Sequence, residues 1–127
     1  MKLEYLDNIG IDESIIRLFN FDKLQAHELK NAIIKNLVNE GIELNINKLS
    51  FISAVNCQLI LRLSINDIGI TTGDKEEFVC DLTIDSYKQM LQLMEPFCER
   101  EYEHQCYQWL YDLDNEIEFL LSPSGQW

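Results

Sequence analysis

The last segment of the chain, Cys106 to Trp127, constrains the fold most, because its large apolar side chains alternate in two short runs separated by acidic residues. Side chains on a strand point to opposite faces with a period of two, so each run places three apolar residues on one face. These are Tyr107, Trp109 and Tyr111 in the first run and Ile117, Phe119 and Leu121 in the second. We predict an antiparallel hairpin with Trp109 opposite Phe119 and a loop over residues 112–116. Its other face is mostly polar, so one face should lie on a core and the other should meet solvent or a partner.

Two segments have apolar residues at the helical period. In the first, Asp22 is a good N-cap and Gly41 closes the helix. The second begins at Thr83 or Asp85, and Pro96 is expected to end or kink it near residues 94–95, because proline has no backbone N–H to donate. The residues expected to face the core are Ala26, Leu29, Ile33, Ile34, Leu37 and Val38 in the first helix, and Ile84, Tyr87, Met90, Leu91, Met94, Phe97 and Cys98 in the second.

Further strands are predicted from β-branched and alternating runs. Residues 14–19 form a first strand, and a short strand is possible in principle within residues 42–46. Residues 58–65 and 77–82 each place apolar side chains on one face, and we predict that they pair as a hairpin through a turn at residues 71–75.

The predicted elements run in the order strand, helix, several strands, helix and two strands. Strands with one polar face and only two helices indicate a two-layer α+β fold, with an antiparallel or mixed sheet and two main helices covering one face. No linker or low-complexity run interrupts the chain, so residues 1–127 are predicted to form a single domain. Residues 1–13 are interpreted as a polar, loosely attached lead-in.

The net charge of −12 restricts the partners of the chain. Binding to nucleic acid or to an anionic membrane needs clusters of Lys and Arg, which this sequence lacks. The hydrophobic content of 46% is ordinary for a globular protein, so the charge does not indicate disorder. The charge favours a basic partner, or it serves solubility alone.

The sequence also indicates a compartment. The first residues contain neither the apolar core nor the cleavage site of a signal peptide, and no apolar run approaches the roughly 20 residues of a membrane span. The four cysteines, Cys57, Cys80, Cys98 and Cys106, show no CxxC spacing, and we predict that they are reduced and mostly buried thiols. We therefore expect a cytoplasmic protein.

No familiar motif of catalysis or cofactor binding is present. The sequence has no GxGxxG motif and no Walker loop, and the run from Gly69 to Gly73 is interpreted as a turn. Nucleophilic catalysis needs a base held by a third group, and neither histidine fits that role. His27 lies beside Glu28 as a surface residue would, and neighbouring glutamates favour the charged form of His104. We therefore predict no catalytic residues, no enzyme activity and no cofactor.

Two weak patterns for metal binding are rejected. Cys98, His104 and Cys106 carry suitable zinc ligands, but their spacing matches no common zinc motif. Residues 112–118 place acids at alternate positions as a calcium loop does, but Ile117 occupies the position of the turn glycine. No metal site is predicted.

The acidic residues of the C-terminal part are the candidate binding site. Between Glu95 and Glu118 the chain carries eight acids and one arginine, interleaved with tyrosine and tryptophan. An acidic rim with aromatic anchors is typical of an interface that captures a basic protein. The predicted partner-binding residues are Glu99, Glu101, Glu103, Trp109, Asp112, Asp114, Glu116 and Glu118. The alternative is that the aromatic side chains face the core and the acids face only water.

The end of the chain, from Pro96 to Trp127, looks like the C-terminal pattern of small bacterial proteins of unassigned function. In its size, its acidity and its lack of active-site motifs, the whole chain resembles the bacterial immunity proteins, small inhibitors that neutralise a cognate toxin. The resemblance is one of type, and no residue correspondence is carried over. It implies a non-catalytic protein that sequesters a basic toxin domain, such as a nuclease, through an acidic face.

Two other interpretations stay open. A structural or adaptor subunit, acting through self-association or through pairing of a sheet edge, also fits a sheet with an uncovered polar face. An enzyme with a carboxylate site would require an enclosed pocket with perturbed acidic groups. The sequence does not choose between a monomer and a homodimer.

Overall fold

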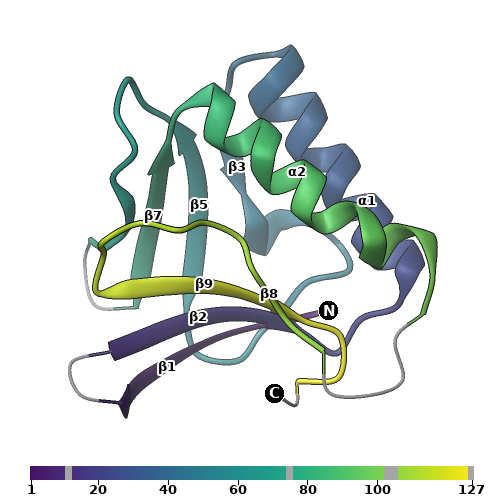
Figure 1. The fold of residues 1–127 in the computed structure, drawn as a ribbon, viewed down its shortest axis with the longest axis horizontal. Coiled ribbons are helices and arrows are strands. Elements are labelled where there is room, and N and C mark those ends of the chain that lie inside the picture. Colours follow the sequence, from purple (N-terminus) through teal and green to yellow (C-terminus); the bar gives the residue numbers. More distant parts are fainter. Residues whose placement is uncertain (11–12, 74–75, 102–105, 126–127) are drawn as a thin grey trace.

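The computed structural model describes residues 1–10, 13–73, 76–101 and 106–125 (Figure 1). These residues form an α+β fold with two α-helices and two mixed sheets, one of five strands and one of four. The predicted fold class is confirmed, and the strands are divided between two sheets.

The first sheet joins the two end regions of the chain. Its strands are β1 (Lys2–Gly10), β2 (Glu13–Phe19), β4 (Ser53–Ala54), β8 (Gln108–Trp109) and β9 (Ile117–Ser122). Their order is β4–β1–β2–β9–β8, with β2 and β9 as parallel neighbours at the centre. β1 is antiparallel to β2, and β8 is antiparallel to β9. The strand predicted at residues 14–19 and the C-terminal hairpin are both present.

The lead-in expected at residues 1–13 is not observed, because residues 2–10 form β1. β1 lies between β4 and β2, and both Met1 and Leu3 are buried. Met1, Leu3 and Tyr5 alternate with charged residues, which is the period of a strand with one buried face. Because many residues in segment 1–13 are polar or charged, this alternation was overlooked in the sequence.

The C-terminal hairpin has a register one residue away from the predicted one. Trp109 pairs with Leu120 and not with Phe119. The predicted register requires that β9 has one polar face, but β9 lies between two strands and buries Phe119, Leu120 and Leu121 almost completely. Because apolar side chains occupy both faces of β9, their alternation does not distinguish the two registers.

The second sheet corrects the predicted central hairpin. Its strands are β3 (Leu44–Asn45), β5 (Gln58–Leu63), β6 (Gly69–Thr72) and β7 (Glu77–Leu82), in the order β3–β5–β7–β6. β5 and β7 are parallel, and it is β6 that forms an antiparallel hairpin with β7. The run from Gly69 to Gly73, which was interpreted as a turn, is therefore mainly the strand β6, and its Ile70 is buried in the core.

Both predicted helices are present. α1 (Lys23–Ile33) continues as a π-helical turn (Ile34–Asn39), and α2 spans Ile84–Glu99. The side chain of Asp22 accepts a hydrogen bond of 2.8 Å from the backbone N–H of Gln25, and the two residues form a capping box. Thr83 caps α2 in the same way, through the N–H of Ser86 at 3.2 Å.

Pro96 does not end the second helix. α2 continues through Pro96 to Glu99, so of the end or kink expected near residues 94–95 the end is wrong. The hydrogen bond that Pro96 cannot donate would go to the carbonyl of Gln92, one turn earlier. Gln92 lies on the exposed side of the helix and not in the core.

One hydrophobic core joins both helices to both sheets. α1 and α2 lie side by side over the second sheet, and the strands of the first sheet run across the strands of the second below them (Figure 1). Tyr87 of α2 is fully buried, and its hydroxyl shares its one proton between the carbonyl oxygens of Arg62 and Cys80, each 2.8 Å away. This one side chain ties α2 to β5 and to β7.

Candidate functional site

The acidic loop, residues 112–116, connects β8 to β9 and is fastened to the edge strand β6. The side-chain amide of Asn115 donates to the carbonyl oxygens of Ile68 and Ile70 over 3.2 and 3.1 Å. The backbone N–H of Ile70 donates to the hydroxyl of Tyr111 over 3.2 Å, and that hydroxyl donates to the carbonyl oxygen of Ile117. These bonds hold both ends of the acidic loop against one strand.

The side chains of the acidic loop alternate between two directions. Leu113 and Asn115 are half-buried against the fold, whereas Asp112, Asp114 and Glu116 are exposed. The inward residues fix the backbone, and the outward residues are the three acids. The acidic loop therefore presents three carboxylates from a backbone that is already ordered.

Gly69 makes the close approach of this loop possible. Its φ of +86° is unfavourable for any residue with a side chain, and a Cβ at this position would lie 2.2 Å from Nδ2 of Asn115. The sequence signal was the glycine itself, which sequence analysis assigned to a turn.

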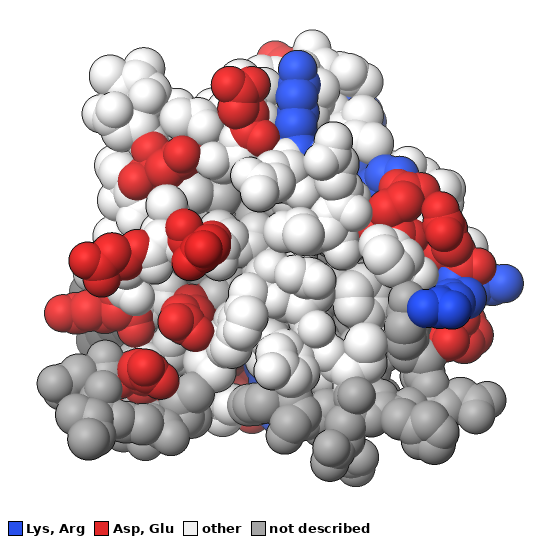
Figure 2. Space-filling view, in the orientation of Figure 1, with Lys and Arg blue, Asp and Glu red and all other residues white. Residues whose placement is uncertain are grey.

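The three exposed acids are not neutralised by the rest of the described chain. The ion pairs between two described residues are Arg17–Glu4, Lys30–Glu95 and Arg62–Asp81, and none of these includes an acid of the acidic loop. Figure 2 shows acidic side chains in two groups on opposite sides of one face. Lys and Arg side chains accompany the group beside the helices, whereas no described Lys or Arg stands among the group on the left in this view.

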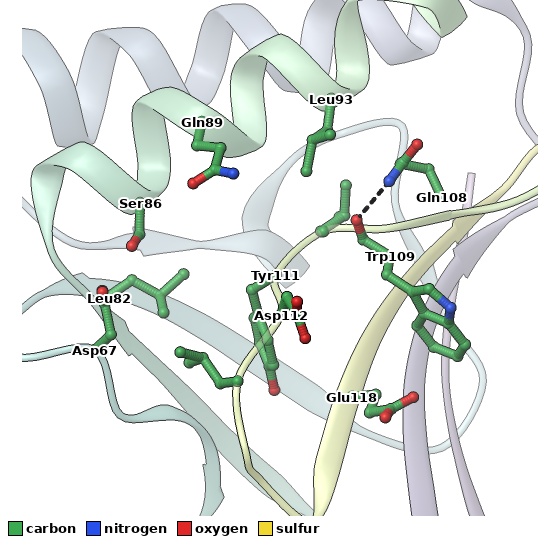
Figure 3. Close-up of a pocket in the computed structure, with 12 residues that line it drawn as sticks. Asp67, Leu82, Ser86, Gln89, Leu93, Gln108, Trp109, Tyr111, Asp112 and Glu118 are labelled. Atoms are coloured by element: carbon green, nitrogen blue, oxygen red, sulfur yellow. Dashed lines mark hydrogen bonds between the residues drawn. The ribbon is translucent and has the colours of Figure 1, made fainter.

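A pocket of about 730 Å³ lies between α2 and the segment that leads from β8 into the acidic loop (Figure 3). α2 contributes one wall and residues 108–113 contribute the other, with β7, β9 and the β5–β6 connection at its ends. The lining residues are Asp67, Leu82, Ser86, Gln89, Leu93, Gln108, Trp109, Leu110, Tyr111, Asp112, Leu113 and Glu118. They include three carboxylates and no His, Cys, Lys or Arg.

Glu118 carries a charge that its surroundings disfavour. Burial raises the pKa of the Glu118 carboxyl above its usual range, and the negative charges of Glu13 and Asp112 raise this pKa further. A cation placed beside this carboxylate would stabilise its charged form and so offset the shift. The pocket therefore favours a positively charged occupant.

Asp67, at the other end of the pocket, holds the N-terminus of α2. Its carboxylate accepts hydrogen bonds from the backbone N–H and the hydroxyl of Thr83, over 2.8 and 3.0 Å, at the N-terminus of α2. The bond from this N–H, together with one from the hydroxyl of Ser86, lowers the pKa of Asp67. The pKa of Asp67 is therefore shifted in the opposite direction to that of Glu118, and the cause is the contact that caps α2. Figure 3 places the two carboxylates far apart across the pocket.

The structure brings together five of the eight residues predicted for partner binding. Trp109, Asp112 and Glu118 line the pocket, and Asp114 and Glu116 are on the acidic loop beside it. The ring of Trp109 lies edge-to-face on that of Tyr107, with centroids 5.9 Å apart.

The other predicted residues lie apart from this site. Glu99 is exposed at the last position of α2. Glu101 lies at the start of α1, where its carboxylate accepts from the backbone N–H of Lys23 over 3.2 Å. Glu103 is outside the described residues. Sequence analysis missed Asp67, Ser86 and Gln89, and no pattern in the sequence links them to the C-terminal segment, because they come from separate elements.

The described part of the chain offers little other chemistry. In it, no group of three or more His, Cys, Asp or Glu side chains is arranged to hold a metal ion. All four cysteines are free thiols; Cys57 and Cys80 are buried, and Cys98 and Cys106 are half-buried. Neither of the two described helices has the length and apolar character needed to cross a membrane.

Comparisons of this chain with protein-family models, with curated proteins and with solved structures gave no match in any of the three.

Proposed function

We propose that this protein is a non-catalytic binding protein that sequesters or neutralises a basic protein partner through the acidic loop and the adjoining pocket. The observation that carries the proposal is the set of three exposed carboxylates, Asp112, Asp114 and Glu116, on a loop fastened to β6. The resemblance of the chain to immunity proteins makes a bacterial toxin domain of the nuclease type the partner class to test first.

The geometry suits capture of a basic surface. A loop that is ordered before binding loses little conformational entropy when the partner arrives, so less of the interaction energy is lost. Like charges gathered on one side, without compensating cations among the described residues, attract a basic partner and increase its rate of association. The net charge of −12 extends this attraction over the whole molecule.

Sheet-edge pairing, the mode of a structural or adaptor subunit, is less well supported. The edge strands β3, β4 and β8 have two residues each, which offers few free backbone groups to another chain. The longer edge strand β6 has its backbone at Ile68 and Ile70 already bonded to Asn115 and Tyr111. These contacts favour binding through side chains over pairing through a free edge.

The proposal is tested first by affinity capture from the native lysate with the full chain as bait, followed by elution in increasing salt. We expect a basic protein that elutes as salt screens the charges. Its nuclease activity is then assayed with and without the chain. Recovery of the chain alone, as a dimer that salt does not dissociate, would contradict the proposal and support the adaptor alternative.

The captured partner then allows a sharper test of the acidic loop. A triple variant, Asp112→Asn, Asp114→Asn and Glu116→Gln, is compared with a control of equal charge change, Glu28→Gln, Glu40→Gln and Glu43→Gln, whose sites are all exposed. At low salt the loop variant should associate roughly tenfold more slowly, and the control variant should stay within about twofold of wild type. Equal slowing of both variants would assign the effect to net charge and not to the acidic loop.

A further inference from the structure

The pocket beside the acidic loop has walls of two kinds. Leu82, Leu93 and Trp109 line the pocket with apolar and aromatic side chains, and Asp112 and Glu118 line it with carboxylates (Figure 3). A long side chain with an apolar stem and a positive head matches this combination. The volume of about 730 Å³ exceeds that of a single side chain, so residues that flank the inserted one also enter.

The connection that contributes Asp67 to the pocket also carries exposed apolar residues. The connection from β5 to β6, residues 64–68, contributes Asp67 to the lining. Ile65 in this connection is 93% exposed, and Ile68 is 48% exposed. The side chain of Ile65 therefore has almost no packing contact in the isolated chain. Its burial against a partner would be favourable by the hydrophobic effect. Apolar surface next to a charged pocket indicates a protein segment as the occupant, because a small cation would leave that surface in water.

We propose that the pocket receives one arginine side chain from a basic protein segment, and that the apolar residues flanking this arginine pack on the connection that carries Ile65. The proposal deepens the proposed function and rests on it, since it names the chemical group that the acidic site recognises.

Arginine fits the site better than lysine does. Its planar guanidinium stacks on an aromatic ring such as that of Trp109 and donates several hydrogen bonds in a fixed fork, which suits the separate carboxylates of Asp112 and Glu118. The ammonium of lysine is a compact, strongly hydrated charge without a planar face. The raised pKa of Glu118 also acts in favour of the complex, because a guanidinium beside this carboxylate would stabilise its charged form.

The test uses the full chain, labelled with ¹⁵N, and a pentapeptide with one arginine between two leucines. Two matched peptides carry citrulline or lysine in place of the arginine. In an NMR titration we expect the arginine peptide to shift the signals of Gln89, Trp109, Asp112 and Glu118, and to bind at least about threefold more tightly than the lysine peptide. The citrulline peptide, which lacks the charge, should bind at least about tenfold more weakly than the arginine peptide.

Variants of the chain locate the binding site. Glu118→Gln should weaken binding of the arginine peptide roughly threefold to tenfold, the range expected for a partly buried ion pair. Glu99→Gln, the removal of an exposed acid at the end of α2, should leave affinity within about twofold. Ile65→Ser should weaken the leucine-flanked peptide but not the same peptide with glycine flanks.

Several results would overturn the assignment. They are equal binding of the citrulline peptide, equal binding of the lysine peptide, and shifts spread over exposed acids such as Glu28 and Glu99. Each of these would leave the proposed function standing if the loop variant still slowed association with the captured partner. Conversely, the titration needs no partner, so a failed capture does not affect its outcome.

Discussion

The side-chain amide of Asn115 occupies the space that a side chain on Gly69 would fill. Nδ2 of Asn115 donates to the carbonyls on either side of Gly69, and a Cβ on this glycine would lie 2.2 Å from that nitrogen. A residue on the acidic loop and a glycine at the start of β6 are therefore fitted to each other. This fit decides whether the acids of the loop are presented from a fixed backbone.

Gly69→Ala should destabilise the protein and loosen the acidic loop. The positive φ costs about 1–2 kcal/mol for a residue with a Cβ. Displacement of Asn115 adds the loss of its two hydrogen bonds, about 1 kcal/mol each. The control is Gly41→Ala, where φ is +66° but no atom lies within 4 Å of the added Cβ. Urea unfolding should give a larger loss for Gly69→Ala than for Gly41→Ala, and equal losses would show that the contact with Asn115 is unimportant.

Tyr87→Phe should cost about 0.5–1.5 kcal/mol, because it removes the hydrogen bond that the hydroxyl donates to the carbonyl oxygens of Arg62 and Cys80. The ring still fills its space in the core, so the fold should be retained. Tyr107→Phe is the matched control, since Tyr107 is 48% exposed, and it should change the free energy of unfolding by less than about 0.5 kcal/mol. Chemical denaturation of both variants measures the difference. A Tyr87→Phe variant as stable as wild type would mean that the hydroxyl contributes nothing to the packing of α2 on β5 and β7.

The buried thiols should resist modification in the native state. Burial raises the pKa of Cys57 and of Cys80 to about 12, so very little thiolate is present at pH 8. We expect both to react with a disulfide reagent at least about a hundredfold more slowly in native protein than in urea. Half-buried Cys106 should react before either of them. Mass spectrometry of timed samples gives the order, and early labelling of Cys80 would contradict its burial.

Several parts of the fold follow from local patterns in the sequence. α1 begins after the predicted cap Asp22, and α2 is capped by Thr83, one of the two residues at which its start was predicted, because capping depends on residues within one turn. The pairing of strands does not follow in this way. The register of Trp109 and the parallel pairing of β5 with β7 depend on which strands become central, and that is decided by residues far apart in the chain.

In the candidate site, too, features set by neighbouring residues could be predicted from the sequence, and features set by residues far apart in the chain could not. The acids of the acidic loop were identified from their density along the chain, and their alternation with Leu113 and Asn115 is visible in the sequence. The pocket was not predictable, because α2 and the connection before β6 supply Gln89 and Asp67 from distant positions. The separation of Glu101 from the acidic loop was hidden for the same reason, since its partner is the backbone of Lys23.

Glu118→Gln should increase stability at neutral pH, although the same change is expected to weaken binding. The folded state raises the pKa of Glu118, so the unfolded state releases this proton at a lower pH than the folded state does. Stability therefore falls as pH rises from the unfolded pKa to the folded pKa, and the penalty remains above that range. Below about pH 4 the carboxyl is protonated in both states and the variant should lose its advantage.

Glu116→Gln is the control for this comparison, because Glu116 is exposed on the acidic loop and its substitution should change stability by less than about 0.5 kcal/mol at any pH. Unfolding free energies of wild type and both variants, measured from pH 3.5 to 8, give the result. Replacement of a residue that serves only the fold would lower the unfolding free energy of the protein. A gain in stability together with weaker binding of the arginine peptide would show that the buried charge of Glu118 serves recognition at the expense of the fold. A loss of stability at pH 7 would contradict the unfavourable burial of this carboxylate.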